Sequence, residues 1–510
     1  MPYSIHLLLA LTSLPVECLR AARATQRAET DLQQDVITPV LEQVCRLVEQ
    51  FRQQRVTPAE TCRFEQQLRE ELRELGRHIC QWAYNQVEPA VDNLSKHVRF
   101  EAGVYTRLNH KTPQNVWTLF GQVRLWRVGY RPSDKSGDAT LFPLAMALGL
   151  VHGTTPALAE RAAWLLGATG MTQSQTLLRL RQDHGVGWGV KKLRQVTAAL
   201  AATLSAERHE TQVARLLELL QQASASTGKH KPVLSVGRDG ITLGVRCQGG
   251  SLFEVATTGT VTVLDRRGRR LGTVYLAYTP EFGQKTMSTA LTQLLQDVLR
   301  RWQGPLPRLC YVTDAGDNET TYYDKLLRRM KHPTSGGRLE WIRVVDYYHA
   351  SERIWTMAEL LFGKGRQSKA WARKMQKWLK KPGGVNRVLH SAAAFRELYC
   401  VRGKKRVEFQ RAYRYLRDRM QFMRYHEYRS LGVPLGSGIT EAGCKTVYTQ
   451  RLKLSGMRWK QRGAQTILNL RVLQLSGVWE AAYRAALNKY DEAIVGDQME
   501  PNARLARKAA

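Results

Sequence analysis

VLSVGRDGITLGV, residues 233 to 245, has the hydrophobic periodicity of a β-strand and carries one acid within its apolar run. Two further strand-like runs follow, SLFEVATTGTVTVLD from 251 and LGTVYLAYTP from 271. Helix and strand patterns then alternate through TMSTALTQLLQDVLRRW, RLCYVTDAG, TTYYDKLLRRM and EWIRVVDYYH. Three consecutive strands followed by alternating helices and strands predict a mixed α/β sheet.

The charge of the chain indicates a polyanionic partner. Lys and Arg number 77 against 44 Asp and Glu, a net charge of +33, and 43% hydrophobic residues are enough for two or three packed domains. Double-stranded DNA is our first hypothesis for such a surface, and an anionic membrane or a ribosomal setting are its competitors.

Two acids stand in strand-like runs. Asp239 lies inside the first run, where burial of a lone carboxylate is costly unless it is paired or binds a metal. Asp314 ends the fourth strand, in YVTDAG. Carboxylates that converge repel each other, and a hard divalent cation with oxygen ligands relieves the repulsion. These two residues are therefore candidate metal ligands.

A third acid stands in LGSGITEAGCK, residues 435 to 445. Glu441 follows a flexible Gly-Ser-Gly turn, and we expect Thr440 to be the N-cap of a helix that Glu441 begins. Ala442 and Gly443 would let this helix approach a sheet closely. The simpler alternative is that Glu441 only caps its own helix. Four cations in and after this helix are candidate phosphate contacts: Lys445, Arg451, Lys453 and Arg458.

These motifs resemble those of bacterial insertion-sequence transposases with an RNase H-like DDE domain, related to the Mutator-like superfamily. GRDG at 237–240 resembles the first Asp motif, YVTDAGD at 311–317 the second, and GSGITEAGCKTVYTQRLKLSGMRW at 436–459 the Glu motif. VVDYYHA at 344–350 resembles the Asp-x-x-His motif of this superfamily. The likeness runs from about residue 100 to 480, and the Glu segment is its most specific part.

The resemblance implies a fold and an activity. The fold is an RNase H-like mixed sheet with a large helical insertion, preceded by a mainly helical DNA-binding region. In such a sheet the first and fourth strands are neighbours, which would bring Asp239 and Asp314 together. With Glu441 they would hold two Mg²⁺ or Mn²⁺ ions and catalyse end cleavage and strand transfer.

The resemblance also implies roles for other residues of these motifs. His349 would contact a scissile phosphate or orient a metal-bound water, with a structural role as the alternative, and Asp346 is a secondary candidate beside it. Asp317 could exchange roles with Asp314, although it suits the cap of the next helix better. The Cys pair that some relatives carry after the hairpin is absent from residues 130–142, which puts zinc-dependent DNA recognition in doubt.

A basic segment between Asp314 and Glu441 fits the helical insertion. GKGRQSKAWARKMQKWLKKPGGVNRV, residues 363–388, contains many cations and no acid. We expect a helix that lies on DNA through Arg373 and Lys377, or else a solvated basic face with Trp371 and Trp378 packed inward.

The N-terminal half offers two further DNA-binding candidates. NVWTLFGQVRLWRVGYRP at 115–132 predicts a hairpin around Gly121, with Arg124, Arg127 and Arg131 either solvated or on DNA. Between 157 and 201, two short helices hinged at 185–189 suit a helix-turn-helix. Its candidate contacts are Lys191, Lys192 and Arg194.

We divide the chain as follows: 1–30, an extension; 31–100, a helical region; 101–225, the hairpin and helix-turn-helix-like region; 231–355, the first part of the catalytic core; 356–432, the basic insertion; 433–480, the Glu helix; and 481–510, a tail. The Ser/Gly/Lys-rich segment 221–231 is the clearest boundary. Eight separated cysteines and no membrane span favour a cytoplasmic, nucleoid-associated protein. We expect a homodimer or higher assembly on DNA. The alternatives are a domesticated DNA-binding protein without catalysis and an RNase H-like nuclease without strand transfer.

Overall fold

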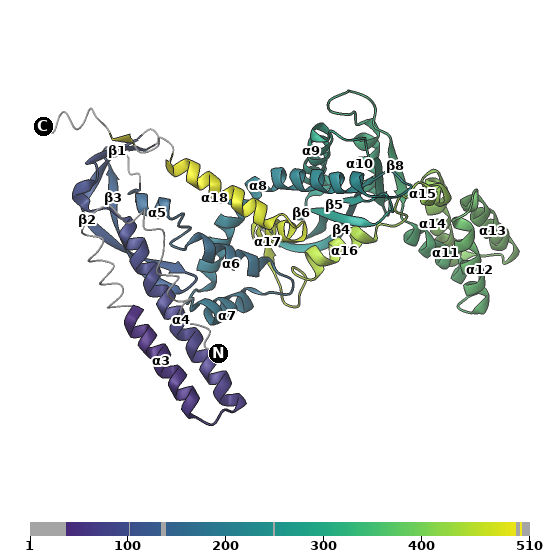
Figure 1. The fold of residues 1–510 in the computed structure, drawn as a ribbon. Helices are drawn as coiled ribbons and strands as arrows, with labels where there is room; N and C mark the ends of the chain where they lie inside the picture. Colours follow the sequence, from purple (N-terminus) through teal and green to yellow (C-terminus); the bar gives the residue numbers. More distant parts are fainter. Residues whose placement is uncertain (1–36, 101–102, 134–138, 248–249, 496–499, 502–510) are drawn as a thin grey trace. The chain divides into compact units, whose positions relative to one another are not determined.

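A computed structural model describes residues 37–100, 103–133, 139–247, 250–495 and 500–501 (Figure 1). The proposed extension at 1–30 lies outside these residues. The described residues form two compact units: the first contains those within 37–162, 173–196 and 487–501, and the second contains those within 163–172 and 197–486. The division falls inside a helix at 196/197 and not at the predicted boundary 221–231, whose first residues still belong to that helix.

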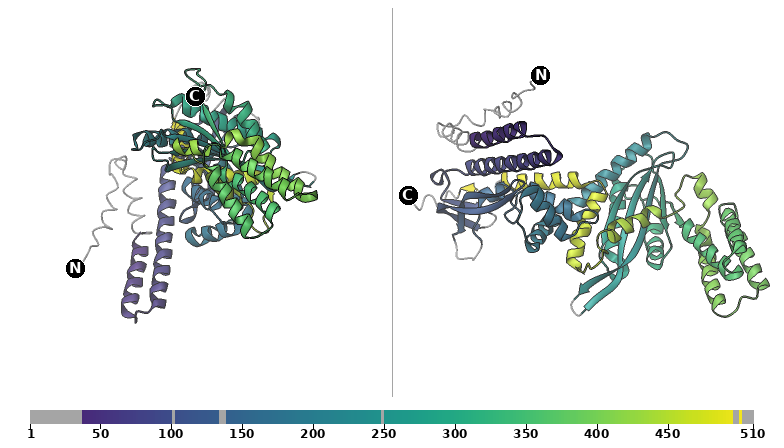
Figure 2. Two further views of the ribbon diagram at one scale, coloured as in Figure 1. Left: turned by 90° about the vertical axis from the view of Figure 1, so that its right-hand side faces the viewer. Right: turned by 90° about the horizontal axis from the view of Figure 1, so that it is seen from below.

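The first unit contains a helical pair and a small antiparallel sheet. Figure 2 shows α3 and α4 side by side. The sheet has the strand order β10-β1-β2-β3. The elements of this unit are α3 (Thr38–Gln53), α4 (Pro58–Val87), η4 (Val91–Asn93), β1 (His97–Phe100), β2 (Gly103–Thr118), β3 (Gly121–Pro132), α5 (Pro143–Ala147), α7 (Gln173–His184) and β10 (Glu500–Pro501).

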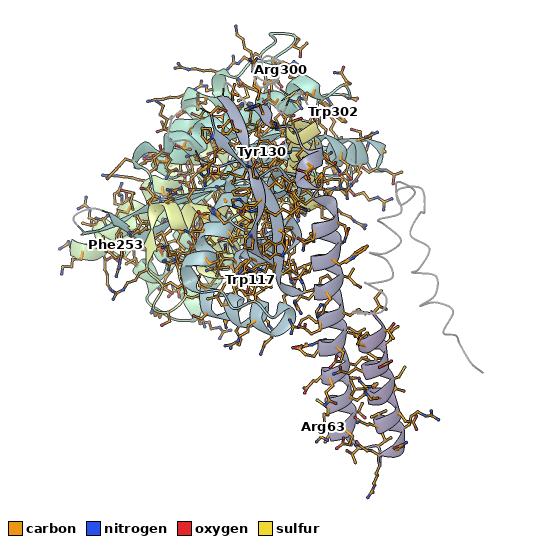
Figure 3. The ribbon with its side chains drawn as sticks, turned by 90° about the vertical axis from the view of Figure 1, so that its left-hand side faces the viewer. Arg63, Trp117, Tyr130, Phe253, Arg300 and Trp302 are labelled. Atoms are coloured by element: carbon orange, nitrogen blue, oxygen red, sulfur yellow. The ribbon has the colours of Figure 1, made fainter. Side chains whose placement is uncertain are left out.

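The predicted hairpin is formed by β2 and β3, with Thr118 paired to Gly121 at the turn. Figure 3 labels Trp117 and Tyr130, one on each strand. The turn needs Gly121 because its φ is 111°, a region that side chains disfavour. Arg127 is half-buried against the ring of Phe142, so of the three predicted basic residues only Arg124 and Arg131 are exposed.

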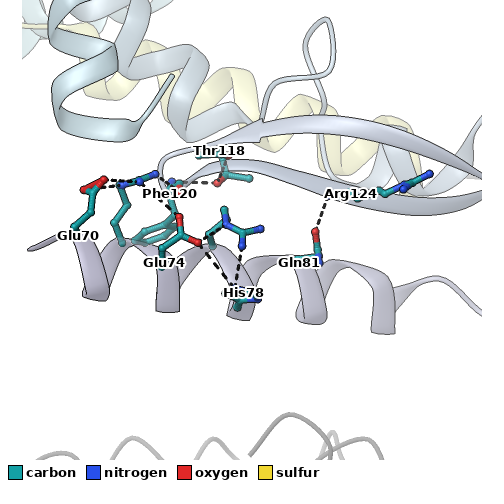
Figure 4. Close-up of polar contacts among 10 residues, drawn as sticks. Glu70, Glu74, His78, Gln81, Thr118, Phe120 and Arg124 are labelled. Carbon is teal, nitrogen blue, oxygen red and sulfur yellow. Dashed lines mark hydrogen bonds and ion pairs between the residues drawn. The ribbon is translucent and has the colours of Figure 1, made fainter. Parts of the chain in front are cut away.

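Polar side chains of α4 pair with the backbone of β3. The amide of Arg124 donates to Gln81 Oε1 (2.8 Å) and that of Trp126 to Asn85 Oδ1 (2.7 Å). Figure 4 shows the first of these contacts, together with the ion pairs of Glu70 and Glu74. A helix thus satisfies amides on the free edge of β3 that would otherwise pair with another chain.

The second unit is built on a mixed sheet, as predicted. Its path is β6-β5-β4-β7-β8, and β9 pairs with the end of β4. β4 is antiparallel to β5 and parallel to β7, which is parallel to β8. The strands are β4 (Val233–Cys247), β5 (Gly250–Leu264), β6 (Arg270–Tyr278), β7 (Arg308–Thr313), β8 (Trp341–Val345) and β9 (Trp459–Lys460).

Helices cover both faces of this sheet. Figure 1 shows α9 and α10 on one side and α16 on the other. The helices are α9 (Lys285–Arg301), α10 (Asp317–Lys325), α11 (Tyr347–Phe362), α12 (Arg366–Leu379), α13 (Gly384–Leu398), α14 (Gly403–Arg419), α15 (Tyr425–Ser430), α16 (Gly438–Cys444) and α17 (Gln461–Leu475). Short 3₁₀ turns are η5 (Phe282–Gln284), η6 (Leu327–Arg329) and η7 (Met420–Phe422), and a π-helical turn, η8 (Lys445–Thr449), continues α16.

The period of two along the strands separates two cores. In β7, Leu309 and Tyr311 face the core formed with α8 and α9, whereas Cys310 and Val312 face the core formed with α11 and α12. Because both faces are covered, β7 and β8 are buried along almost their whole length.

Three helices contribute residues to both compact units, namely α6 (Pro156–Gly167), α8 (Val190–Ala225) and α18 (Trp479–Val495). Of these, α18 crosses a boundary that we predicted, because it begins before residue 481 and occupies the first half of the proposed tail. α7 and α8 are the predicted helix pair, but α8 has 36 residues and is not short. Its second half is apolar and packs on the mixed sheet through Val213, Leu216 and Leu220.

Candidate active site

The first candidate acid, Asp239, lies in β4 opposite Thr258 of β5, partly buried on the face that α16 covers. The amide of Gly240 donates to its Oδ1 (2.7 Å). Burial raises the pKa of Asp239, and the charges of Asp314 and Glu441 raise it further, against a lowering by hydrogen bonds from Cys444 and Gly240. The three predicted acids therefore interact electrostatically.

Asp314 directly follows the last residue of β7. The last pair between β4 and β7 is Val236 with Tyr311, and Asp239 and Asp314 each come three residues later in parallel chains. Equal steps along two parallel chains place Asp239 and Asp314 at the same level, just beyond the end of the β4–β7 pairing.

The turn after Asp314 has an unusual backbone. Ala315, which is buried, has a φ of 62°, the left-handed region that side chains rarely adopt. The amide of Gly316 donates to Asp314 Oδ1 (3.1 Å), and the amide of Ala315 donates to Thr313 Oγ1 (3.2 Å). These bonds hold the carboxylate at the end of the strand.

The insertion supports the same turn from outside. Tyr415 of α14 donates its hydroxyl to the carbonyl oxygen of Asp314 (2.6 Å). Arg419 donates Nε and Nη2 to the carbonyl oxygen of Ala315 (3.3 and 3.1 Å), and its guanidinium lies over the Tyr415 ring. The helical insertion is therefore part of the architecture that positions Asp314.

Glu441 lies in the first turn of α16, but not at the position that we predicted. The helix begins at Gly438 with Ser437 as its N-cap residue, so Thr440 is not the cap. Thr440 is buried, and its hydroxyl pairs with that of Thr260 in β5 (2.7 Å). Our prediction placed the start three residues late because the Gly-Ser-Gly segment, expected to be a turn, already contributes Gly438 to the helix.

Two contacts fix how α16 sits on the sheet. A side chain on Gly237 of β4 would place its Cβ 2.0 Å from Thr440 Oγ1, so only glycine allows this approach. A Cβ on Gly443 would meet Tyr275 at 3.1 Å. As expected from its small residues, the helix lies close to the strands, with Glu441 on the same side as Asp239.

Asp346 connects the end of β8 to the turn before Glu441. It is fully buried and caps α11, accepting from the amides of Tyr348 (2.5 Å) and His349 (3.0 Å) through Oδ1. Its Oδ2 accepts from the amide and the hydroxyl of Ser437, the latter at 2.7 Å. The Ser437 hydroxyl also lies 2.7 Å from Glu441 Oε1. Asp346 is thus a positioning residue, because its oxygens are occupied by these donors.

His349 faces Glu441. Its Nε2 lies 3.6 Å from Glu441 Oε1, and its Nδ1 lies 3.3 Å from Glu352 Oε2. Burial lowers the pKa of His349, but the Glu352 hydrogen bond and the charges of Asp346, Glu352 and Glu441 outweigh burial and raise it. The imidazole therefore favours its cationic form more than a free histidine does.

A fourth acid near these groups was missed in the sequence. Glu319 lies in the first turn of α10 and is 8% exposed. Its carboxylate lies against the backbone of Gly316, because a Cβ on that glycine would be 2.5 Å from Glu319 Oε2. Burial raises its pKa, the charges of Asp314 and Asp239 add to this, and Arg238 opposes it. The sequence signal that could have revealed Glu319 is the pair of acids, Asp317 and Glu319, at the start of a helix. Of this pair, Asp317 is exposed and Glu319 is buried.

The donor chemistry fits a hard divalent cation, although the side chains do not form a ligand cluster. Within the described ranges, no three His, Cys, Asp or Glu side chains form a group that could hold a metal ion. Asp239, Asp314 and Glu441 nevertheless supply carboxylate oxygens, which Mg²⁺ and Mn²⁺ prefer. A cation among them would relieve the repulsion that helps to raise the pKa of Asp239.

The predicted DNA contacts fall into two groups. Lys192 and Arg194 take part in local hydrogen bonds, with the His152 carbonyl and with Gln173 Oε1. Apart from Arg451, the other predicted contacts lie exposed on the surface, namely Lys191, Arg373, Lys377, Lys445, Lys453 and Arg458.

The prediction for Arg451 is wrong. Arg451 is fully buried and donates Nε to the carbonyl oxygen of Leu166 (3.0 Å). Burial and the charge of Arg471 lower its pKa to about 10. A guanidinium enclosed in this way connects α6 to the segment after α16 and has no surface to offer to a phosphate.

The tryptophans of the insertion pack inward, as in the alternative that we kept open. Trp371 is buried and donates Nε1 to Ser391 Oγ (3.0 Å), and Trp378 packs beneath the cations of Lys381 and Arg387. The basic face of α12, with Arg373 and Lys377, remains exposed.

The chain is similar in sequence to a protein whose name states no activity. No family model matches the chain. It is 26% identical over 405 residues to a Streptococcus gallolyticus protein named "UPF0236 protein in vanSb 3'region", with 77% of this chain and 78% of that protein covered. Within the described residues, no helix is both long and apolar enough to cross a membrane.

Proposed function

We propose that this protein is a DDE transposase with an RNase H-like catalytic core, and that it catalyses metal-dependent cleavage and strand transfer at the ends of an insertion sequence. The observation that carries the proposal is the placement of three acids: Asp239 in β4, Asp314 directly after the parallel strand β7, and Glu441 in α16, which packs closely on β4 and β5. The strand order β6-β5-β4-β7-β8, with β4 parallel to β7, also supports it.

Each acid comes from a different part of the chain. Asp239 is held within β4, Asp314 by the turn that Tyr415 supports, and Glu441 by a helix packed on the strands. Two Mg²⁺ or Mn²⁺ ions, when bound by these acids, would supply activation of water or of a 3′-hydroxyl and stabilisation of the leaving oxygen. The protein contributes their oxygen ligands and the positions of those ligands.

Other groups would bind the DNA. The raised pKa of His349 favours an imidazolium, which can donate to a non-bridging oxygen of the scissile phosphate. Lys445, Lys453 and Arg458 are exposed on the segment that follows Glu441, where they can hold the backbone of the same duplex. We place the protein in the bacterial cytoplasm with the nucleoid, acting as a homodimer or a higher assembly that brings two ends together.

The test is cleavage and joining of labelled DNA from the regions that flank the gene, in Mg²⁺ and in Mn²⁺. We compare the wild type with Glu441→Gln, and with Glu359→Gln as a control that removes the same charge from an exposed position of α11. Joined products from the wild type and the control, and DNA binding without either step by Glu441→Gln, support the proposal.

Two other outcomes favour the alternatives. Cleavage without joined products indicates a nuclease that lacks strand transfer. If all three proteins bind DNA and none cuts it in any divalent metal, the protein is a DNA-binding protein and Glu441 has a structural role.

A further inference from the structure

A cationic cavity lies at the opposite end of the mixed sheet from the acids. Asp314 and Asp346 follow the last residues of β7 and β8, whereas the cavity is formed by residues that precede β8. Its volume is about 410 Å³, and it is lined by Asp324, Arg328, Arg329, Lys331 and Arg338.

The cavity is built on buried anchors. Leu327, Met330 and Leu339 are 0%, 6% and 4% exposed and pack in the core beneath the sheet. The amide of Leu339 donates to the Met330 carbonyl (3.2 Å), and Lys331 pairs with Arg338 in an antiparallel bridge. The flanking cations are therefore held close together by fixed backbone, despite their mutual repulsion.

The acid in the cavity wall is shared with another cation. Asp324 Oδ1 lies 3.9 Å from Nη1 of Arg343, whose side chain is 3% exposed. A buried guanidinium needs such a counter-charge far more than an exposed one does. Asp324 therefore partly neutralises Arg343 as well as the cations of the cavity. With four cations and one shared acid, the lining of the cavity has a net positive charge.

We propose that this cavity binds phosphodiester groups of duplex DNA, in a segment other than the one that reaches the acids. Guanidinium groups match phosphate oxygens in a bidentate manner, and several cations around one concavity can contact adjacent phosphates. Because the cavity and the acids lie at opposite ends of β8, the phosphates that contact the cavity are not those that reach the acids. This inference rests on the proposed function, because it takes DNA to be the ligand of the cavity.

The experiment measures binding of a labelled duplex by fluorescence anisotropy across a salt series, in EDTA. Arg328→Gln/Arg338→Gln should reduce the slope of log K against log salt by about 2, close to 0.9 for each lost phosphate contact. Arg328→Lys/Arg338→Lys keeps the charge and should keep most of the slope. Arg46→Gln/Arg52→Gln removes the same charge from exposed positions of α3 and should leave the slope near that of the wild type.

Three outcomes overturn the proposal. The first is a salt slope for Arg328→Gln/Arg338→Gln that equals the slope of the wild type. The second is a loss of slope in Arg46→Gln/Arg52→Gln as large as the loss in the cavity variant. The third is found by calorimetry: the wild type binds inorganic pyrophosphate, and the cavity variant loses this binding but still binds the duplex as the wild type does. The cavity would then be a site for a small phosphate compound and not for DNA. The binding assay requires no cleavage, so a wild type that fails to cut DNA refutes the proposed function and leaves this result standing.

Discussion

The residue with the clearest electrostatic signature is Asp239, an acid placed in a strand beside two other acids. Burial and the charges of Asp314 and Glu441 raise its pKa, so ionisation of this side chain opposes folding. A site that holds carboxylates together at a cost in stability is typical of catalytic and metal-binding centres.

Asp239→Asn should therefore be more stable than the wild type at pH 7 in EDTA. The folded state binds the proton of Asp239 more tightly than the unfolded state, so the stability of the wild type falls as pH rises from the ordinary pKa of 3.8 through the raised folded pKa. The advantage of the variant should be absent below pH 3.8, and Mg²⁺ should reduce it at pH 7 by stabilising the wild type. Thermal unfolding across pH measures both effects, with the exposed Asp317→Asn as the control; an equal difference at every pH would contradict the prediction.

Tyr415 is the residue through which the insertion acts on Asp314. Tyr415→Phe removes the hydroxyl that donates to the Asp314 carbonyl, and we expect a loss of about 1 kcal/mol in the free energy of unfolding. Cleavage at saturating DNA should slow while DNA affinity is unchanged, because the carboxylate loses its position and not its charge.

The control for this change is Tyr413→Phe, in the same helix, where the ring stacks on Phe409. Chemical denaturation and single-turnover cleavage compare the two variants. Equal cleavage rates for both would show that the contact supports the fold only.

At the scale of elements, the site depends on connections between segments that are distant in the chain. Asp346 joins β8 and α11 to the turn before α16, and tyrosines of α15 cap the outer strand of the sheet. The hydroxyls of Tyr425 and Tyr428 donate to the carbonyls of Val345 (2.9 Å) and Arg343 (3.0 Å) in β8. The insertion thus covers an edge that would otherwise be open to pairing with another strand.

Asp346→Asn should destabilise the protein by about 3 kcal/mol, because an amide cannot replace both oxygens as acceptors. One side of the Asn side chain would present N–H groups to donors, either at Ser437 or at the start of α11. Urea denaturation measures the loss, and Asp418→Asn, in an exposed ion pair with Arg417, should cost less than about 1 kcal/mol. A loss as small as that of Asp418→Asn would mean that the buried network contributes little.

At the scale of the whole molecule, the net charge of +33 is distributed over two units with separate folds. The helical insertion has two roles, because its inner residues support the sheet while the outer face of α12 is basic and exposed. Trp371 is buried, and the ring of Trp378 lies beneath Lys381 and Arg387, so we expect α12 to bind DNA through its charge and not through base stacking.

Arg373→Gln/Lys377→Gln should therefore weaken duplex binding and reduce its salt slope by about 2, with little effect on stability, since both side chains are exposed. Fluorescence anisotropy in EDTA measures the slope, with Arg46→Gln/Arg52→Gln as the control of equal charge. An unchanged slope would identify this surface as a solvated basic face.

The sequence by itself was sufficient for the order of strands and helices from residue 233 to 349, because strands buried on both faces have apolar runs with clear ends. It also singled out Asp239 and Asp314, since a carboxylate within or at the end of such a run is conspicuous. The tertiary structure decided which neighbours each polar group has. Arg451 is basic in sequence but buried, Thr440 belongs to the sheet contact and not to the cap, and Glu319 reaches the acids only because α10 turns back beside β7. Burial and pairing arise from contacts between residues far apart in the chain, which local periodicity does not encode.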